Sequence, residues 1–387
     1  MISFELTPEQ ERIKEEAGEF AEREIASRAA EIDKTDEFPW DVWRKMAEEP
    51  YRYTGMHIPG EYEGHPRSLL DIVVIIEEVA ARGKSPICNL LLELAGLGTA
   101  AIVDGGNEEQ KKKYLPPIAR GEAIGCFSLT EPGTGSDASG IKCRAERVGD
   151  GYVINGRKRY TSGAHESSHV ILFAVTDPNK GSSGISVFVI PTDTPGFSVL
   201  ERVKCIGLRG HQDEELLLKD CRIPRENLIG EEGRGLHYGL KTLDETRTTL
   251  TAGFIGLARA CLEAAVEYAK KRTTFGKPLF QRQALSFPLA DIAVEIDAAR
   301  LLNYKAAWLH DGGMKHTVET AKAKVLASKV MLDAANMGVE VHGGFGCTER
   351  HPVERYYRDA RIWSFAQGTP QMMKFIITRD LFGKYKM

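Results

Sequence analysis

The chain has 387 residues, of which 42% are hydrophobic and 27% charged, a composition typical of a globular protein. A chain of this length predicts two or three domains rather than one core. The net charge of -4 lacks the basic excess of nucleic-acid-binding proteins. No uninterrupted apolar run is long enough to cross a bilayer, and no signal peptide precedes the polar start. We therefore expect a cytoplasmic protein without a membrane span.

The cysteines support the same compartment. There are seven, an odd number, scattered without pattern along the chain. Such a set predicts reduced thiols rather than disulfides. Because no CxxC pair occurs, a thiolate metal site is not expected, and we predict no metal.

The first part of the chain, residues 1–119, is predicted to be a helical domain. Thr7 can cap a helix, Pro8 suits the first helical position, and Gln10 can close a capping box. Segments rich in Glu, Lys and Ala follow, interrupted by the turn-forming residues 58–66.

Residues 120–230 are predicted to form an antiparallel β domain. The strand-like residues 152–154 run into Asn155-Gly156, a pair that predicts a hairpin turn. Two further β-branched and aromatic runs lie at 170–175 and 185–190.

Helical spacing returns in residues 231–387. Leu289, Ile292, Ile296 and Ala299 form one apolar stripe, and the loop at 343–346 interrupts the later helices. The predicted fold class is therefore α+β and multidomain: a helical domain, a central antiparallel β domain and a C-terminal helical bundle.

Three glycine-containing clusters are candidates for ligand binding. Residues 126–137 hold Gly133 and Gly135 and form either a flexible turn or a loop whose backbone approaches a planar or phosphorylated ligand. Residues 272–287 place Arg272 beside a Phe-Gly turn, either as a solvated connection or as a diphosphate or adenine contact. In residues 356–373, Gly368 breaks a helix and leaves backbone N–H groups free for a ligand.

Taken together and in this order, these blocks resemble the acyl-CoA dehydrogenase family over nearly the whole chain. The matching blocks are TEPGTGSD, INGRKRYTSG, GLRG, DETR, RTTFGK, HGGFG and YYRDARI followed by QGT. The resemblance implies a flavoprotein oxidoreductase with one FAD per subunit, an acyl-CoA thioester as substrate, and an electron-transfer flavoprotein or similar acceptor. It also implies a homotetramer, or a dimer of the same type, with FAD between the β domain and the C-terminal helices.

The resemblance carries roles over to single residues. Tyr160 stands where the family usually has Trp near the flavin, and Ser162 where Thr usually donates to flavin N5. The remaining matches line the flavin ring (Phe127, Leu129, Thr130), contact the FAD diphosphate (Ser136), reach the FAD of a neighbouring subunit (Arg272, Phe275, Gln283), cover its adenosine half (Gly343, Gly344), add further FAD contacts (Thr369, Gln371), or bind the substrate and its CoA arm (Asp244, Arg247, Gly368).

Some positions depart from the family pattern. Glu340 replaces the usual Gln before the GG loop, His211 replaces a small residue, and Ala366 replaces a bulky aromatic. The most consequential departure is Gln367, which occupies the position of the usual catalytic glutamate immediately before Gly-Thr. An amide cannot take the proton that the family reaction removes from the carbon beside the thioester.

Three accounts of Gln367 remain open. It is an engineered Glu-to-Gln trap, or it is natural and another carboxylate takes a proton from a different carbon, or the protein binds acyl-CoA without turning it over. The alternative base position of some family members is Thr246 here, and Glu245 beside it is rotated by about 100° along the helix and should point elsewhere, as a surface or ion-pair residue.

Glu93 is the candidate for a relocated base. It lies in the apolar run NLLLELAGLG, where a carboxylate is costly unless it is paired or functional. One interpretation is a paired structural glutamate. The other is a base for 1,4-elimination from a conjugated or alicyclic acyl group, as in the family subset that forms cyclic dienes and lacks the usual Glu; the small Ala366 would widen the pocket for a ring.

Two further functions on the same fold are a flavin oxidase or monooxygenase without CoA, and a non-catalytic acyl-CoA-binding protein. Arg247 and the DETR block favour a CoA substrate over the first, and the complete flavin set argues against the second.

Overall fold

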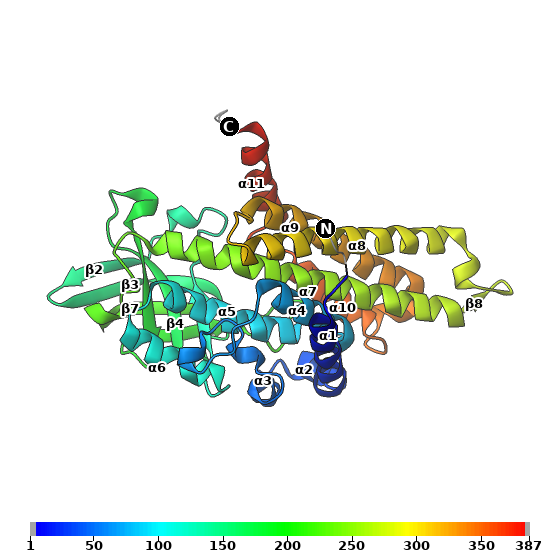
Figure 1. Cartoon of the computed structure of the whole chain (residues 1–387), viewed down its shortest axis with the longest axis horizontal. Coiled ribbons are helices and arrows are strands. Elements are labelled where there is room, and N and C mark those ends of the chain that lie inside the picture. The colour runs from blue at the N-terminus through cyan, green and yellow to red at the C-terminus, as the bar shows by residue number, and fades with distance from the viewer. Residues whose placement is uncertain (1–4, 384–387) are drawn as a thin grey trace.

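The computed structural model describes residues 5–383 and has helices at both ends of the chain with a β-sheet domain between them (Figure 1). The first helical part contains α1 (Pro8–Ala21), α2 (Ala29–Thr35), α3 (Trp40–Ala47), α4 (Leu69–Gly83), α5 (Ile87–Gly105) and α6 (Glu108–Ala119), with a π-helical turn at Glu22–Ala26 and 3-10 turns at Tyr53–Gly55 and Gly60–Tyr62. The capping box at Thr7 and Gln10 is present at the start of α1, as predicted.

The β domain is one seven-stranded sheet with the order β1-β4-β2-β3-β7-β6, in which β5 pairs with β4. Its pairings are mostly antiparallel, but β4 pairs in parallel with β1 and with one residue of β2. The strands are β1 (Gly125–Ser128), β2 (Arg144–Val148), β3 (Gly151–Ser162), β4 (His169–Val175), β5 (Ile185–Pro191), β6 (Phe197–Arg202) and β7 (Asp213–Pro224).

The prediction of a hairpin turn at Asn155-Gly156 is wrong. Both residues lie inside β3, where the register against β7 shifts between Ile154 and Gly156. The hairpin turn is at Gly149 and Asp150, with Gly149 at a φ of 60°. Strand pairing on both sides of β3 overrides the local preference of Asn-Gly, which forms a β-bulge instead of a turn.

The C-terminal part is a bundle built around α7. Its elements are α7 (Gly235–Lys271), α8 (Gln283–Asp311), α9 (Thr317–His342), α10 (Val353–Trp363) and α11 (Pro370–Phe382), with a small hairpin of β8 (Thr273–Thr274) and β9 (Lys277–Pro278) between α7 and α8 and a 3-10 turn at Gly343–Cys347. The predicted stripe from Leu289 to Ala299 is buried in α8. Figure 1 shows α11 projecting from the body, and β8 at the opposite end of the molecule from the sheet.

Helix α7 is long and apolar enough to cross a membrane by length and composition alone. However, 72% of its most apolar window is buried inside the protein, as in the core helix of a globular domain. The length of α7 decides how far apart its ends are: 37 residues span roughly 55 Å at about 1.5 Å per residue.

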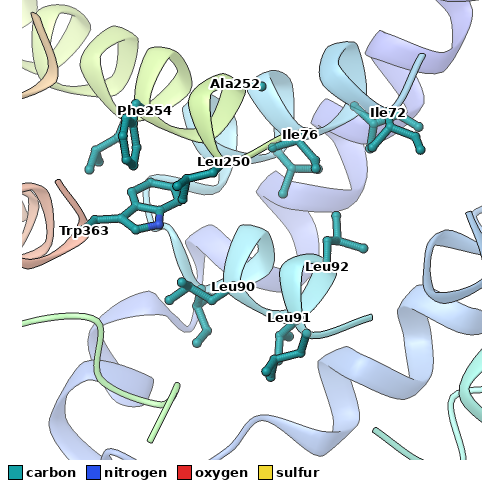
Figure 2. Packing of buried hydrophobic residues seen from close by; sticks show 14 of the residues in the cluster. Ile72, Ile76, Leu90, Leu91, Leu92, Leu250, Ala252, Phe254 and Trp363 are labelled. Atoms are coloured by element: carbon teal, nitrogen blue, oxygen red, sulfur yellow. The ribbon is translucent and has the colours of Figure 1, made fainter. Parts of the chain in front are cut away.

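The largest hydrophobic core joins the two helical parts. Figure 2 shows the indole of Trp363 beside Leu250 and Phe254 of α7, in a cluster that also contains side chains of α4 and α5. Phe254 packs edge-on against this indole at a centroid distance of 5.0 Å. The core therefore holds α5 and the end of α10 against the middle of α7, which fixes the elements that carry the site described below.

A buried ion pair anchors the glycine loop of residues 130–137 to the sheet. Lys158 of β3 is fully buried, and its Nζ lies 2.9 Å from Oε1 of Glu131 and 3.1 Å from the Leu129 carbonyl. Glu131 also accepts from the backbone N–H groups of Lys142 and Cys143. The loop is thus held by contacts that satisfy both charges.

Replacing Lys158 by Met tests this anchor. The variant leaves the Glu131 carboxylate buried without its cation, which is expected to lower the free energy of unfolding by about 3–5 kcal/mol. Urea unfolding measures the change. The control Lys180→Met removes an exposed lysine that pairs with Asp177 and should cost at most about 1 kcal/mol. Equal stability of the two variants would show that the buried pair does not hold the loop.

Candidate active site

The site is built on the turn between α10 and α11, residues 366–368. Gln367 has a φ of 53° and Gly368 a φ of 103°, so both adopt left-handed backbone that is unfavourable for Gln. Lys324 of α9 is fully buried, and its Nζ donates to the carbonyls of Ala366 and Gly368 at 2.5 Å each. Arg247 of α7 donates through Nε to the Gln367 carbonyl at 2.9 Å. Two cations thus bind three successive carbonyls and hold the strained turn in place.

Arg247 is itself positioned by a carboxylate. Its guanidinium lies 3.0 Å from Asp244, one helical turn earlier, and Asp244 accepts a hydrogen bond of 2.7 Å from Thr317 of α9. Arg247 is largely buried, with part of its donor set committed to the turn and to Asp244. The structure therefore brings together Asp244, Arg247 and Gly368, the three predicted substrate-binding residues.

The side chain of Gln367 bridges two neighbouring helices. Its Oε1 lies 2.8 Å from Oγ1 of Thr246 in α7, and its Nε2 lies 3.2 Å from Oε2 of Glu93 in α5. The two catalytic candidates of the sequence, Gln367 and Glu93, are therefore in direct contact. The alternative base position, Thr246, completes the same cluster.

Glu93 is buried among apolar side chains, and burial raises the pKa of its carboxyl group to about 8. The hydrogen bond from Gln367 and the positive charge of Lys324 act in the opposite direction and limit this rise. The indole N–H of Trp363 also lowers this pKa as a hydrogen-bond donor to the carboxyl group, whose Oε1 is buried. Burial and the nearby Arg247 lower the pKa of Lys324 to about 7. A carboxyl group with a pKa near neutrality is suited to exchange a proton.

Glu245 points away from this cluster, as predicted from its rotation along the helix. Its carboxylate lies 3.7 Å from Nε2 of His310 in α8. It is thus an ion-pair residue rather than a base.

The predicted flavin-ring residues lie in and just after β1 and near the end of β3, where these strands approach the helix of Glu93. A Cβ on Gly98 of α5 would lie 2.5 Å from the carbonyl oxygen of Gly125 in β1, and one on Gly163, just after β3, would contact Leu94 of α5. Phe127 packs against Phe173 with 4.8 Å between ring centroids, and Tyr160 is half-exposed. The ends of β1 and β3 therefore meet the helix that carries Glu93.

Ser162 has a partner that the sequence analysis missed. Its hydroxyl donates to Oδ1 of Asp213 at 2.8 Å. Asp213 starts β7, which pairs with β3 at this position, but the two residues are 51 apart in sequence. Lys324 was also missed, although its signal was present: it shares a helical stripe with the apolar Ala327 and Met331 and is buried with them.

The residues present fit FAD. Within residues 5–383, a Cβ built on Gly133, Gly135, Gly343 or Gly344 would meet no atom within 4 Å, so the backbone of both loops faces open space that a ligand can fill. Ser136 is exposed next to the first pair of glycines, where a hydroxyl suits a diphosphate. Thr369 caps α11 through Met372 N–H, and Gln371 is exposed on the first turn of that helix.

Arg272, Phe275 and Gln283 are not brought together with the other flavin residues of the same chain. They lie around the β8–β9 hairpin, at the end of α7 that is remote from the sheet (Figure 1), and Phe275 is 96% exposed. From Thr246 to Arg272 the rise along α7 is roughly 39 Å. These residues cannot contact the flavin site beside Glu93 in their own subunit.

The raised pKa of Glu93 predicts a pH-dependent stability. Because the folded protein binds this proton more tightly than the unfolded chain, Glu93 makes the protein progressively less stable as pH rises from about 4.5, its ordinary value, through about 8. Glu93→Gln is neutral at every pH. Its melting temperature should therefore be closest to that of the parent at pH 5 and should exceed it by a growing margin towards pH 9. Differential scanning calorimetry checks this; a constant difference across this range would contradict the assigned ionisation.

Three family models match successive parts of the chain: the N-terminal, middle and C-terminal domains of acyl-CoA dehydrogenases, over residues 7–122, 126–221 and 233–382. A probable acyl-CoA dehydrogenase of Bacillus subtilis is 40% identical over 98% of this chain and 100% of its own.

Solved structures agree with this match. A glutaryl-coenzyme A dehydrogenase in complex with glutaryl-CoA superimposes with a TM-score of 0.94, at 34% identity over 100% of this chain and 98% of its own. A chain from a structure described as the electron-transferring flavoprotein of Acidaminococcus fermentans superimposes with a TM-score of 0.92, at 37% identity over 99% of this chain and 100% of its own. With the predicted fold and a site that fits FAD, this chain belongs to the acyl-CoA dehydrogenase family and is an FAD-dependent enzyme of that class.

Proposed function

We propose that this enzyme dehydrogenates a conjugated, alicyclic acyl-CoA by 1,4-elimination, with Glu93 as the base. FAD supplies the acceptor for the hydride. Glu93 takes the proton from a ring carbon that is conjugated to the thioester through the existing double bond. The electron pair of that C–H bond shifts the double bond, and a second forms where the hydride leaves. The acyl group thereby loses two hydrogens and becomes a conjugated diene.

The observation that carries this proposal is the contact between Gln367 and Glu93. The amide at the usual base position cannot accept the proton. The carboxylate that the Gln367 amide nitrogen contacts, at 3.2 Å, is that of Glu93 on α5. A base displaced by one side chain reaches a different carbon of the bound acyl group, remote from the carbon beside the thioester. The small Ala366 next to Gln367 leaves more room for a ring than an aromatic residue would.

Gln367 retains a second role through its backbone. Among the described residues, its N–H has no hydrogen-bond acceptor, while its carbonyl is bound by Arg247. A fixed, unpaired N–H is suited to the negative charge that develops on the thioester carbonyl oxygen when a proton leaves. The substitution therefore removes the side-chain base without removing this donor.

The same assignments extend to the cofactor and the CoA arm. Phe127, Leu129, Thr130, Tyr160 and Ser162 would face the flavin ring of their own subunit. Asp244 and Arg247 would hold the CoA arm. An electron-transfer flavoprotein is the proposed acceptor of the electrons, the cytoplasm is the proposed compartment, and the proposed domains are residues 1–119, 120–230 and 231–387.

A second candidate function is ordinary 1,2-dehydrogenation by a parent enzyme with Glu at position 367, of which this chain would be a Glu-to-Gln trap. The observation that favours it is the size match of Gln and Glu in a site whose other contacts are intact. A non-catalytic acyl-CoA-binding protein is the third account. The test below separates the three.

The test uses single-turnover bleaching of the bound flavin. The parent should bleach with a cyclohexene carboxyl-CoA, and Glu93→Gln should slow this by about 10²–10⁴-fold with binding retained. The matched control Glu245→Gln removes a carboxylate that pairs with His310 and should remain close to the parent. If Glu93→Gln bleaches as fast as the parent, the base is not Glu93. If instead only Gln367→Glu gains activity, on a saturated acyl-CoA, the chain is a Glu-to-Gln trap of a 1,2-dehydrogenase. If the flavin of neither the parent nor Gln367→Glu is bleached, the account of a non-catalytic acyl-CoA-binding protein remains.

We also propose a homotetramer, because α8 presents a second apolar stripe to solvent. Phe287, Val294, Leu301 and Trp308 recur every seven residues and are 48–70% exposed. A heptad seam of this kind is typical of a helix that packs against another helix. A partner subunit would also bring its Arg272, Phe275 and Gln283 to the flavin that these residues cannot reach in their own chain.

Introducing charge into this stripe tests the assembly. Val294→Glu together with Leu301→Glu should reduce the mass in light scattering from four chains to two or one, and should lower the FAD content because part of each FAD site would be lost. The control Glu295→Gln lies on the same helix outside the stripe and should leave the mass unchanged. A monomeric parent, or a double variant with full mass, would contradict the proposal.

A further inference from the structure

The amide of Gln367 lies between a hydroxyl group and a carboxyl group, and each of them can act as a hydrogen-bond donor or as an acceptor towards it. Thr246 Oγ1 is 2.8 Å from the amide oxygen, and Glu93 Oε2 is 3.2 Å from the amide nitrogen. Gln has two donors on one side of its amide and an acceptor on the other. Its orientation is therefore set by what these two neighbours can donate.

The hydroxyl of Thr246 has one proton but two acceptors within reach. Its Oγ1 lies 2.8 Å from Gln367 Oε1 and 2.9 Å from the backbone carbonyl of Thr242. The carbonyl can only accept, so the proton goes to one acceptor or the other. When it goes to Thr242, Thr246 presents only lone pairs to Gln367, and the amide satisfies them by turning its NH₂ towards Thr246.

Each orientation of the amide suits one protonation state of Glu93. With Thr246 donating to the amide oxygen, the NH₂ group donates to an ionised Glu93. With the amide turned over, its oxygen faces Glu93 and accepts from a protonated carboxyl group. Both arrangements place a donor opposite an acceptor at both contacts, because turning the amide over exchanges the positions of its oxygen and its nitrogen.

We propose that Gln367 and Thr246 form a two-state hydrogen-bond relay that positions Glu93 both before and after it takes a proton. Gln367 is thus a positioning residue, since it acts through Glu93 and transfers no proton itself. This inference rests on the proposed role of Glu93 as the base. A Glu at position 367 could not serve in the same way, because two adjacent carboxyl groups would share one proton.

The relay occupies one of the two carboxyl oxygens of Glu93. Gln367 contacts Oε2, and the other oxygen, Oε1, is buried. Lys324 of α9 is the charged group that acts on Glu93, and Arg247 of α7 acts in turn on Lys324. The indole N–H of Trp363, at the end of α10, is buried and acts on the Glu93 carboxyl group as a hydrogen-bond donor. Since burial raises the pKa of Glu93 to about 8, both protonation states are populated near neutral pH.

Infrared titration of the FAD-loaded protein tests the relay. The carboxyl band of Glu93, identified by its loss in Glu93→Gln, should titrate together with the side-chain carbonyl band of Gln367, identified by its loss in Gln367→Met. Gln367→Met removes the hydrogen bond to the ionised form of Glu93 and the hydrogen bond to its protonated form. Because the bond to the ionised form is charge-assisted and the stronger of these two, the titration midpoint of Glu93 should rise by about one pH unit. Thr246→Val should abolish the joint shift of the Gln367 band, and Thr246→Ser, which keeps the hydroxyl, should preserve it.

Two results would overturn the relay: a Gln367 band that does not move with pH, or a Glu93 midpoint that is the same in the parent and in Gln367→Met. Flavin bleaching separates this failure from that of the proposed function. Rapid bleaching by Glu93→Gln would remove the base whatever the infrared bands do. Slow bleaching by Glu93→Gln, combined with infrared bands that titrate independently, would keep Glu93 as the base and overturn the relay alone.

Discussion

The site depends on two buried cations that bind three successive carbonyls. Lys324 holds the carbonyls of Ala366 and Gly368, and Arg247 holds the carbonyl of Gln367 between them. These charge-assisted bonds offset the cost of burying the cations and of the left-handed backbone at Gln367. Because α7 and α9 supply the cations, packing of the helical bundle decides where the turn lies. The orientation of the Gln367 side chain and of its free N–H follows from that placement.

The same cations make a buried carboxylate possible. Glu93 of α5 is buried and would be far too costly as an isolated ion in these apolar surroundings. Lys324 favours its ionised form across the cluster, and Gln367 donates to it. Both protonation states of Glu93 are therefore accessible near neutral pH. Loosening the turn would disturb the base and the N–H donor together, although Glu93 belongs to α5 and the N–H to the turn between α10 and α11.

The sequence predicted what depends on local pattern and missed what depends on distant pairing. The Thr7 cap, the buried face of α8 and the break at Gly368 all follow from neighbours within a few residues. Asn155-Gly156 carries a strong local turn signal, but pairing with β2 and β7 keeps it in a strand. Asp213 beside Ser162 could not be found from spacing, because strand register alone brings them together. The contact of Glu93 with Gln367 likewise joins residues 274 apart.

These contacts change how the amide at position 367 is understood. Considered by itself, Gln367 is the loss of a catalytic carboxylate. Within the cluster, a carboxylate at 367 would lie against Glu93, and two adjacent carboxyl groups cannot both ionise at neutral pH. An amide at this position donates to Glu93 and lets it carry the charge alone. The amide at position 367 and the ionisable carboxyl group at position 93 therefore belong to one arrangement. In it the proposed base is Glu93 instead of a Glu at position 367, and the carbon that loses the proton is correspondingly a different one.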